Sequence, residues 1–429
     1  MLTKIKEIFK DRDTRIQIIF TCLMLVIFRI GSNIPVPGID REYLTQVFES
    51  GNMGIFDIFN LFSGGSFQNF TLFALGVTPY ITATIIIQLL TVAFPYFENL
   101  QKEGHEGREK LARISRYSAF GLALLQAFGY AYGFFNRAII DKSPFNIALI
   151  TMLLVSGSMF LMWLGERIEE YGIGSGISIL IYGSIIASLP SEINQIYTRV
   201  QSGSMSFVSF LLLIAGIFVM VLGVVYVQEG ERKIPVQYAA KTNGRMKYAG
   251  DKTYIPLKVN QSGVLPIIFA SSMLQFPAMI LMFFRGTKAY SFYQEWLSPE
   301  GNPGVYIYSS MLVILIILFS FFYQEIALNT KQTADDLAKN GGTVMGVRPG
   351  TPTRKYLSKI SHRLTFAGAV FLSFVAVIPI ILSKVLGVSL VFGGTSLLII
   401  VGVSLEIFKR LSSKRAMIQY RGFLNKKKK

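Results

Sequence analysis

The chain has 429 residues, of which 52% are hydrophobic, and it carries a formal net charge of +17. A soluble protein of this length would form two or three domains, but repeated apolar runs of membrane length override that expectation and indicate an integral membrane protein. Cys22 is the only cysteine and lies within an apolar run, which excludes an intramolecular disulfide. His105 and His362 are far apart and have no cysteine support, so we predict no metal site.

Ten apolar runs of about 20 residues follow one another along the chain. None alternates with the period of a strand over a membrane-length segment, so we predict an all-α polytopic bundle. The candidate spans lie at 16–31, 72–94, 117–136, 146–164, 176–190, 207–227, 263–284, 305–323, 364–383 and 388–407. A basic segment precedes the first of them without a small-residue cleavage site, and we interpret this run as a retained span.

A short apolar run at 55–62 comes before the second span and is far too short to cross a bilayer. Ser63, Gly64 and Gly65 end it. One interpretation is a re-entrant element, which is tolerated at membrane depth only where protein or a water-filled cavity surrounds it. The other is an amphipathic helix on the membrane surface. The spacing alone leaves both open.

The distribution of basic residues predicts the orientation. With ten spans both termini lie on one side of the membrane, and 34 of the 42 Lys and Arg residues fall on that side. By the positive-inside rule, both termini are therefore expected in the cytosol.

Two cytosolic loops, 229–261 and 324–363, are much longer than the others. Each mixes basic residues with Gly and Pro, which predicts folded, turn-rich hairpins rather than helices. One interpretation is that the basic residues only anchor the helices to anionic lipids. The length of the loops favours a docking surface for an acidic partner, such as ribosomal RNA or a cytosolic motor.

A weak internal repeat links the starts of the fifth and tenth spans, where the segments 172–178 and 392–397 combine glycines with hydroxyl residues. We therefore predict two pseudo-symmetric, inverted halves of five spans, residues 1–190 and 191–429.

The predicted spans contain almost no ionisable residues in their central parts, which argues against an ion-driven carrier. The sequence has no Walker-type phosphate loop, no nucleophile–base pairing and no zinc signature, so we predict neither enzymatic activity nor a cofactor. Two isoleucine pairs at i, i+4 spacing, Ile81 with Ile85 and Ile177 with Ile181, share helix faces. Taken alone, such pairs are usually ordinary helix packing.

Short sequence blocks along nearly the whole chain resemble one family. They lie at 59–65, 74–81, 85–90, 102–108, 172–178, 266–272, 347–350, 363–365 and 392–398. Each block is weak singly, but together and in this order they make the chain similar to the bacterial SecY family, the central subunits of a protein-conducting channel. The resemblance implies a passive pore that moves unfolded secretory proteins outward and releases hydrophobic segments sideways into the bilayer.

The resemblance also implies roles for individual residues. The plug would comprise Ile55, Phe56, Ile58, Phe59, Leu61, Phe62, Ser63, Gly64 and Gly65. The pore ring would comprise Ile81, Ile85, Ile177, Ile181, Ile268 and Ile399. A lateral gate between spans two and three and spans seven and eight would contain Gln88, Ser271, Ser272 and Gln275. Arg232, Lys233 and Arg348 would contact the ribosome and the SecA motor.

The partners that the resemblance implies are SecE, SecG, SecA, the ribosome, secretory polypeptides with their signal sequences, and anionic lipids, in a bacterial plasma membrane. Two other functions remain open from the residues. A secondary transporter would need buried charges, and an insertase or lipid scaffold would open only sideways. The gate residues also have a simpler interpretation as interhelical hydrogen bonds, worth about 0.6 kcal/mol each.

Overall fold

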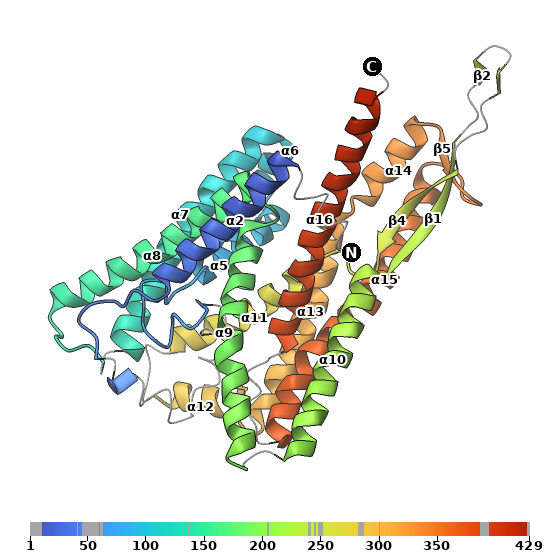
Figure 1. The fold of residues 1–429 in the computed structure, drawn as a ribbon. Coiled ribbons are helices and arrows are strands. Elements are labelled where there is room, and N and C mark those ends of the chain that lie inside the picture. The colour runs from blue at the N-terminus through green and yellow to red at the C-terminus, as the bar shows by residue number, and fades with distance from the viewer. Residues whose placement is uncertain are drawn as a thin grey trace. The chain divides into compact units, whose positions relative to one another are not determined.

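The structure is a computed structural model that describes most of the chain. The described residues are 11–40, 42–44, 60, 63–135, 138–203, 206–238, 242–243, 246–247, 252–281, 287–299, 301–386 and 394–426. They are mostly helical, as predicted, with two small β-sheets formed from residues 231–258 and 342–344 (Figure 1).

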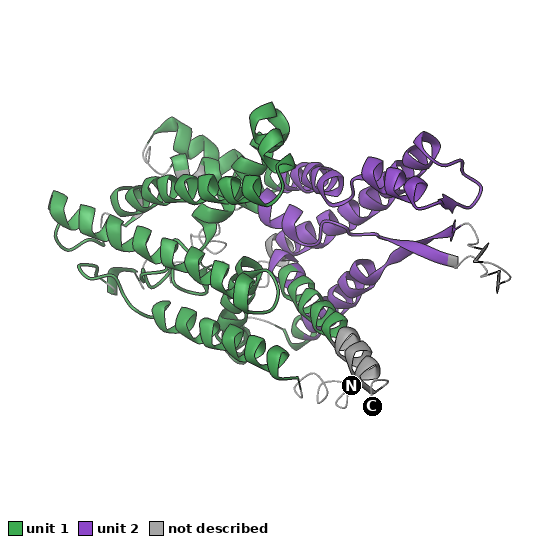
Figure 2. Cartoon of the chain, turned by 90° about the horizontal axis from the view of Figure 1, so that it is seen from above, with its two compact units in different colours: residues 1–210, 271–308, 399–429 green, residues 211–270, 309–398 purple. Residues whose placement is uncertain are grey.

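The chain divides into two compact units, shown in green and purple in Figure 2. Unit 1 is drawn from residues 1–210, 271–308 and 399–429, and unit 2 from residues 211–270 and 309–398. This division groups residues that contact one another in space. The inverted halves 1–190 and 191–429 concern internal symmetry and stay a prediction.

Unit 1 is a set of packed helices. In chain order they are α2 (Arg12–Gly31), α5 (Thr78–Ala93), α6 (Pro95–Lys102), α7 (His105–Gly129), the π-helical η1 (Tyr130–Phe134), α8 (Pro144–Tyr171), α9 (Gly176–Gln201) and α12 (Lys288–Trp296). Helix starts follow local chemistry. The Asp11 carboxylate accepts a hydrogen bond from Thr14 N at the start of α2, and the Ser143 hydroxyl accepts one from Asn146 N at the start of α8. Side-chain oxygens at these positions satisfy backbone N–H groups that lack partners in the helix.

Four helices contribute residues to both units: α10 (Phe207–Glu229), α11 (Leu265–Leu281), α13 (Gly304–Ala327) and α16 (Gly394–Lys426). Unit 2 also contains α14 (Thr330–Lys339) and the 36-residue α15 (Thr351–Leu386).

Among the described residues, six helices are long and apolar enough to cross a membrane: α2, α8, α9, α10, α13 and α15. A seventh span results if α5 and α6 count as one bent helix. A helix overlaps each of the ten predicted spans within the described residues, while the count of ten spans stays a prediction. The bend between α5 and α6 is 100° and lies at Phe94, which is extended because it precedes Pro95.

The second span begins later than predicted. Residues 71–77 form turns, and α5 starts at Thr78 rather than near residue 72. Hydropathy alone did not indicate this because the segment is apolar throughout. The reason is conformational: Gly76 has a φ of 58°, a left-handed conformation that a continuing α-helix does not accommodate.

An aromatic core in unit 1 holds these turns against α7, η1 and α8. Phe67 and Phe70 both pack edge-to-face on Phe135, with ring centroids 5.4 and 4.1 Å apart. Behind them, α8 approaches so closely at Gly157 that a Cβ there would lie 2.0 Å from the Leu72 carbonyl oxygen. Only glycine permits this contact.

The two long loops form one structure in unit 2. Strands β1 (Glu231–Tyr238) and β4 (Lys252–Lys258) of the first loop pair antiparallel, and β5 (Gly342–Val344) of the second loop pairs with the other edge of β1 (Figure 1). The short strands β2 (Thr242–Asn243) and β3 (Met246–Lys247) lie between β1 and β4 in sequence. We call the sheet β4–β1–β5 with α14 the cytosolic module, after the side of the membrane on which the distribution of basic residues predicts it.

The hairpin predicted for the first loop is confirmed, but the one predicted for the second loop is wrong. That loop consists mainly of α14 and the ends of α13 and α15. Asn329 caps α14 by accepting a hydrogen bond from Gln332 N, and Ala334 and Leu337 form its apolar face. Leu337 packs with Val236, Leu257 and Val344, so burial of this face stabilises the helix over the predicted turns.

Candidate functional site

The described end of the predicted plug, Asn60 and residues 63–65, forms a compact turn with the residues that follow it in unit 1. Gly65 N donates to Asn60 O over 3.0 Å, and Gln68 N donates to the Asn60 side chain over 3.0 Å. Gly64 and Gly65 adopt φ angles of 66° and 86°, which glycine reaches without strain. Six of the predicted plug residues lie outside the described residues: Ile55, Phe56, Ile58, Phe59, Leu61 and Phe62.

Two helices hold this turn. Arg29, near the end of α2, donates from Nη1 to Gly64 O over 3.1 Å. On the other side, a Cβ on Gly64 would lie 3.0 Å from the Cα of Ser184 on α9. The sequence analysis did not single out Arg29 or Ser184 for this role, because contacts 35 or more residues apart leave no local signal.

The isoleucines predicted for the pore ring are almost all buried. On α5, Ile81 and Ile85 are each 6% exposed, and on α9 Ile181 is buried while Ile177 is half-buried beside Gly165 of α8. Ile399 of α16 is buried in unit 1, and Ile268 of α11 is buried in unit 2. Their closure into one ring stays a prediction.

The residues predicted for the gate include one buried amide, Gln275, whose nitrogen lacks a hydrogen-bond partner among the described residues. Ser271, Ser272 and Gln275 on α11 are buried, and Gln88 on α5 is half-buried. Among the described residues, Gln275 Nε2 has no hydrogen-bond partner. A buried amide without a partner lowers the stability of the folded protein by roughly 1–3 kcal/mol. The Gln275 side chain would therefore gain from a movement that gives it a new hydrogen-bond partner or a more polar environment.

A second buried amide lies on α7. Gln126 is 2% exposed, and its Oε1 has no hydrogen-bond partner within the described part of the chain. It lies between Ala123 and Ala127 of the aromatic core, against which Phe276 of α11 also packs. Gln126 is not among the predicted site residues, although a glutamine inside the apolar run 121–128 indicates a buried polar group.

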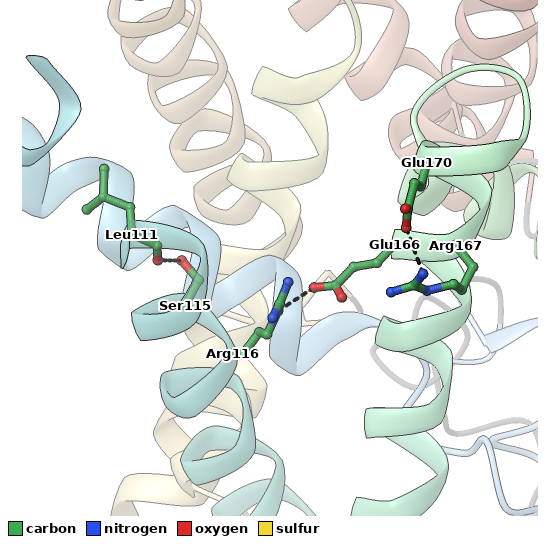
Figure 3. A network of polar contacts seen from close by, with 6 residues as sticks. All are labelled: Leu111, Ser115, Arg116, Glu166, Arg167 and Glu170. Atoms are coloured by element: carbon green, nitrogen blue, oxygen red, sulfur yellow. Dashed lines mark hydrogen bonds and ion pairs between the residues drawn. The ribbon is translucent and has the colours of Figure 1, made fainter. Parts of the chain in front are cut away.

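A polar network joins the middle of α7 to the last turns of α8 (Figure 3). Arg116 Nε lies 2.7 Å from Glu166 Oε1, and Arg167 Nη1 lies 2.7 Å from Glu170 Oε2. The Arg116 and Glu166 side chains are 49% and 26% exposed. An ion pair with that exposure is worth about 0–1 kcal/mol, so we assign the network to helix packing rather than to chemistry.

The basic residues predicted for partner contact all belong to the cytosolic module or the turn beside it. Arg232 and Lys233 are exposed on β1, and Arg348 is exposed in the turn before α15. Lys233 Nζ lies 3.4 Å from a Glu231 carboxylate oxygen and 4.8 Å from the centroid of the Tyr254 ring.

A groove that the sequence analysis did not predict runs along the N-terminal end of α15. Its volume is about 430 Å³. The residues that line it are Thr351, Arg354, Lys355, Ser358, Lys359 and His362. None of its basic side chains forms an ion pair with a described residue, so the groove presents positive charge and hydroxyl donors to solvent. In the sequence these residues recur every three or four positions, as on one face of a helix, but they lie within the predicted loop 324–363.

In the part of the chain that the structure describes, no three His, Cys, Asp or Glu residues lie close enough together to hold a metal ion. Cys22 is exposed on α2.

Comparison with known proteins places these features in one family. The SecY family model matches residues 71–408. Protein translocase subunit SecY of Bacillus subtilis is 42% identical over 436 residues, covering 99% of this chain and 100% of the relative. Among solved structures, "The structure of a protein conducting channel" has a TM-score of 0.69 at 20% identity and covers 94% of this chain and 92% of that one. Sec61 in the canine ribosome–channel complex has a TM-score of 0.64 at 20% identity, with the same coverage.

The two structural matches establish the fold, and the match to the relative extends over almost the whole length of both chains. The sequence blocks that suggested the family, the apolar helices and the family model therefore agree, and the chain belongs to the SecY family.

Proposed function

We propose that this multi-pass membrane protein is the central subunit of a protein-conducting channel. The observation that carries the proposal is the 42% identity to the SecY translocase subunit over the full length of both chains. The channel moves unfolded secretory polypeptides across a bacterial plasma membrane. It is passive and catalyses no reaction, so any ATP hydrolysis belongs to a partner such as SecA.

In this proposal the six isoleucines form an apolar constriction. A ring of branched aliphatic side chains offers no fixed hydrogen-bond partner to a passing chain, so cargo of any sequence leaves as easily as it enters. When it is empty, an apolar constriction excludes ions and water by dewetting. The burial of Ile81, Ile85 and Ile181 is compatible with such a constriction.

Residues 55–65 close the empty pore as a plug. The turn at the end of this segment, where Gly64 accepts a hydrogen bond from Arg29 and lies close to Ser184, gives the plug a rigid point of attachment.

Signal sequences leave the pore sideways, between the helix pair α5 and α7 on one side and the pair α11 and α13 on the other. The buried, unpaired amides of Gln126 and Gln275 support this assignment, because an amide without a partner lowers the cost of separating the helices that bury it. Gln88, Ser271 and Ser272 add further polar groups on the same helices.

The ribosome docks on the cytosolic module, as the match to a ribosome-bound channel supports. Arg232, Lys233 and Arg348 provide exposed charge, and the α15 groove adds basic side chains with Ser and Thr hydroxyls. These donor types are the ones that contact nucleic-acid phosphates. SecA uses the same surface, SecE and SecG complete the channel, and anionic lipids attract the basic loops.

The experiment that tests the pore is a disulfide trap. Cys22→Ser removes the only native thiol, and Ile181→Cys introduces one at the ring. A secretory polypeptide carrying a single cysteine is arrested midway through translocation and oxidised mildly. We expect a crosslink at Ile181→Cys and at an Ile85→Cys companion.

The matched control is Leu211→Cys on α10, whose side chain is 58% exposed on an apolar helix. It is expected to give no crosslink. Secretion that continues without a crosslink at any of the six ring positions would show that the isoleucines only pack the bundle and that cargo passes elsewhere.

A further inference from the structure

Helix α12 is amphipathic in a way that the channel function does not use. It connects α11 to α13 and spans Lys288–Trp296. At 100° per residue its side chains divide into two continuous arcs. The polar arc consists of Lys288, Ser291, Gln294 and Glu295. The aromatic arc consists of Tyr290, Phe292, Tyr293 and Trp296.

The protein covers only half of the aromatic arc. Tyr293 is 5% exposed, and burial raises the pKa of its hydroxyl to about 12, so it stays neutral. On the other half, Phe292 is 57% and Trp296 is 41% exposed. Their rings are stacked with centroids 6.1 Å apart, so the two form one continuous apolar surface that the described residues of unit 1 leave about half uncovered.

Glycine contacts fix α12 to the end of a membrane helix. Gly304 is the first residue of α13, and a Cβ there would lie 2.6 Å from Ser298 O and 2.7 Å from Glu295 O. A Cβ on Gly301 would lie 2.2 Å from Glu295 O. The last turn of α12 therefore touches the first turn of α13, which is apolar and long enough to cross the bilayer.

Exposed side chains with apolar surface also lie on both flanking helices. Tyr306, two residues into α13, is 59% exposed, and Ile280, at the end of α11, is 43% exposed. These residues and α12 belong to unit 1. Exposed aromatic rings on α12 and exposed side chains near the joined ends of α11 and α13 therefore belong to the same unit, next to a helix that is apolar and long enough to cross a membrane.

We propose that α12 lies in the membrane–water interface, opposite the cytosolic loops, with Phe292 and Trp296 inserted among the phospholipids. Amphipathic helices of this kind bury their apolar face about 5–10 Å into the boundary between headgroups and acyl chains. Trp and Tyr are the residues most enriched at that depth, because an apolar ring with a polar tip suits a layer that is half wet. The partner is a lipid surface, and the helix anchors the outer ends of α11 and α13 to it.

The chain allows a direct test because it contains only two tryptophans, Trp163 and Trp296. Trp163→Phe leaves Trp296 as the single reporter. The full chain is reconstituted into phosphatidylcholine–phosphatidylglycerol vesicles in which the phosphatidylcholine is brominated near the headgroup or near the end of the acyl chain. We expect blue-shifted emission, stronger quenching by bromine near the headgroup, and little quenching by iodide in the buffer.

The reference is Trp296→Phe, which leaves Trp163, a 45% exposed residue on the membrane helix α8, as a reporter that bromine must reach. A matched pair then tests the two arcs. Phe292→Asp places a carboxylate on the apolar arc and is expected to abolish bromine quenching of Trp296. Ser291→Asp, its neighbour on the polar arc, is expected to leave the quenching unchanged.

Quenching of Trp296 by iodide but not by bromine would overturn the proposal, since α12 would then lie in water. Quenching by neither would overturn it as well, because another part of the chain or a second copy of it would then cover the helix. If Phe292→Asp lowers the midpoint of thermal unfolding, the Trp163→Phe measurement alone decides between these results.

Discussion

At the scale of single residues, glycines set how closely backbones approach in unit 1. At Gly157 the absent Cβ leaves room for the Leu72 carbonyl, which an alanine would meet at 2.0 Å. We predict that Gly157→Ala destabilises the protein by about 1–3 kcal/mol, because backbone on both sides must move to relieve the overlap. The midpoint of thermal unfolding in detergent measures this change.

Gly121→Ala is the matched control. Gly121 also lies inside a helix, and nothing lies within 4 Å of a Cβ placed there. The same substitution should stabilise the protein slightly, by about 0.5–1 kcal/mol, since alanine loses less conformational freedom than glycine in a helix. Equal effects at the two positions would contradict the close approach of α8 to residues 71–77.

At the scale of elements, the cytosolic module has its own small core. Val236 of β1 is 1% exposed and packs with Leu257, Leu337 and Val344. We predict that Val236→Asp unfolds the module while the membrane helices persist, because an unpaired carboxylate cannot be buried among these residues without a cost of several kcal/mol. Limited proteolysis would then cut within 229–261, with the helical circular dichroism signal nearly unchanged.

The adjacent Gln237→Asp adds the same charge on the exposed face of β1. It should leave the cleavage pattern unchanged. Cleavage of both variants would mean that charge, rather than loss of the core, opens the loop.

Prediction from the sequence succeeded for elements whose signal is local. The apolar runs located helices because each span must satisfy its own backbone in lipid. It failed where a distant partner decides the conformation. The turns at 71–77 depend on packing against Phe135 and Gly157, and α14 depends on burial of Leu337 under a sheet strand 100 residues earlier.

The candidate site shows the same division. The residues of the ring and gate came from family resemblance, and their burial agrees with those roles without testing them. Arg29, Gln126 and the α15 groove emerged only from the structure. The hydrogen bond of Arg29, the missing partner of the buried Gln126 amide and the shape of the groove all depend on surroundings that the sequence does not display.

At the scale of the whole molecule, the distribution of basic residues predicts the orientation. In a Cys22→Ser background, a cysteine replacing Gln237 should lie in the cytosol and one replacing Ser291 outside. A membrane-impermeant maleimide added to intact cells should label only Ser291→Cys, and both should react in detergent. Labelling of Gln237→Cys alone would reverse the orientation.

The sheet of the cytosolic module also imposes an order on biosynthesis. Thr343 of β5 donates a hydrogen bond to Gln237 O of β1 across a sequence separation of 106 residues, and α11, α12, α13 and α14 are made in between. At about 5–20 residues per second, the ribosome needs roughly 5–20 s to supply that stretch. For this interval the nascent hairpin of β1 and β4 carries an open edge, which β5 closes only after the intervening helices have been synthesised. A chain arrested before Gly342 would therefore keep an unpaired strand edge that another strand could bind. The completed sheet forms only in a chain whose helices up to α14 have all been made.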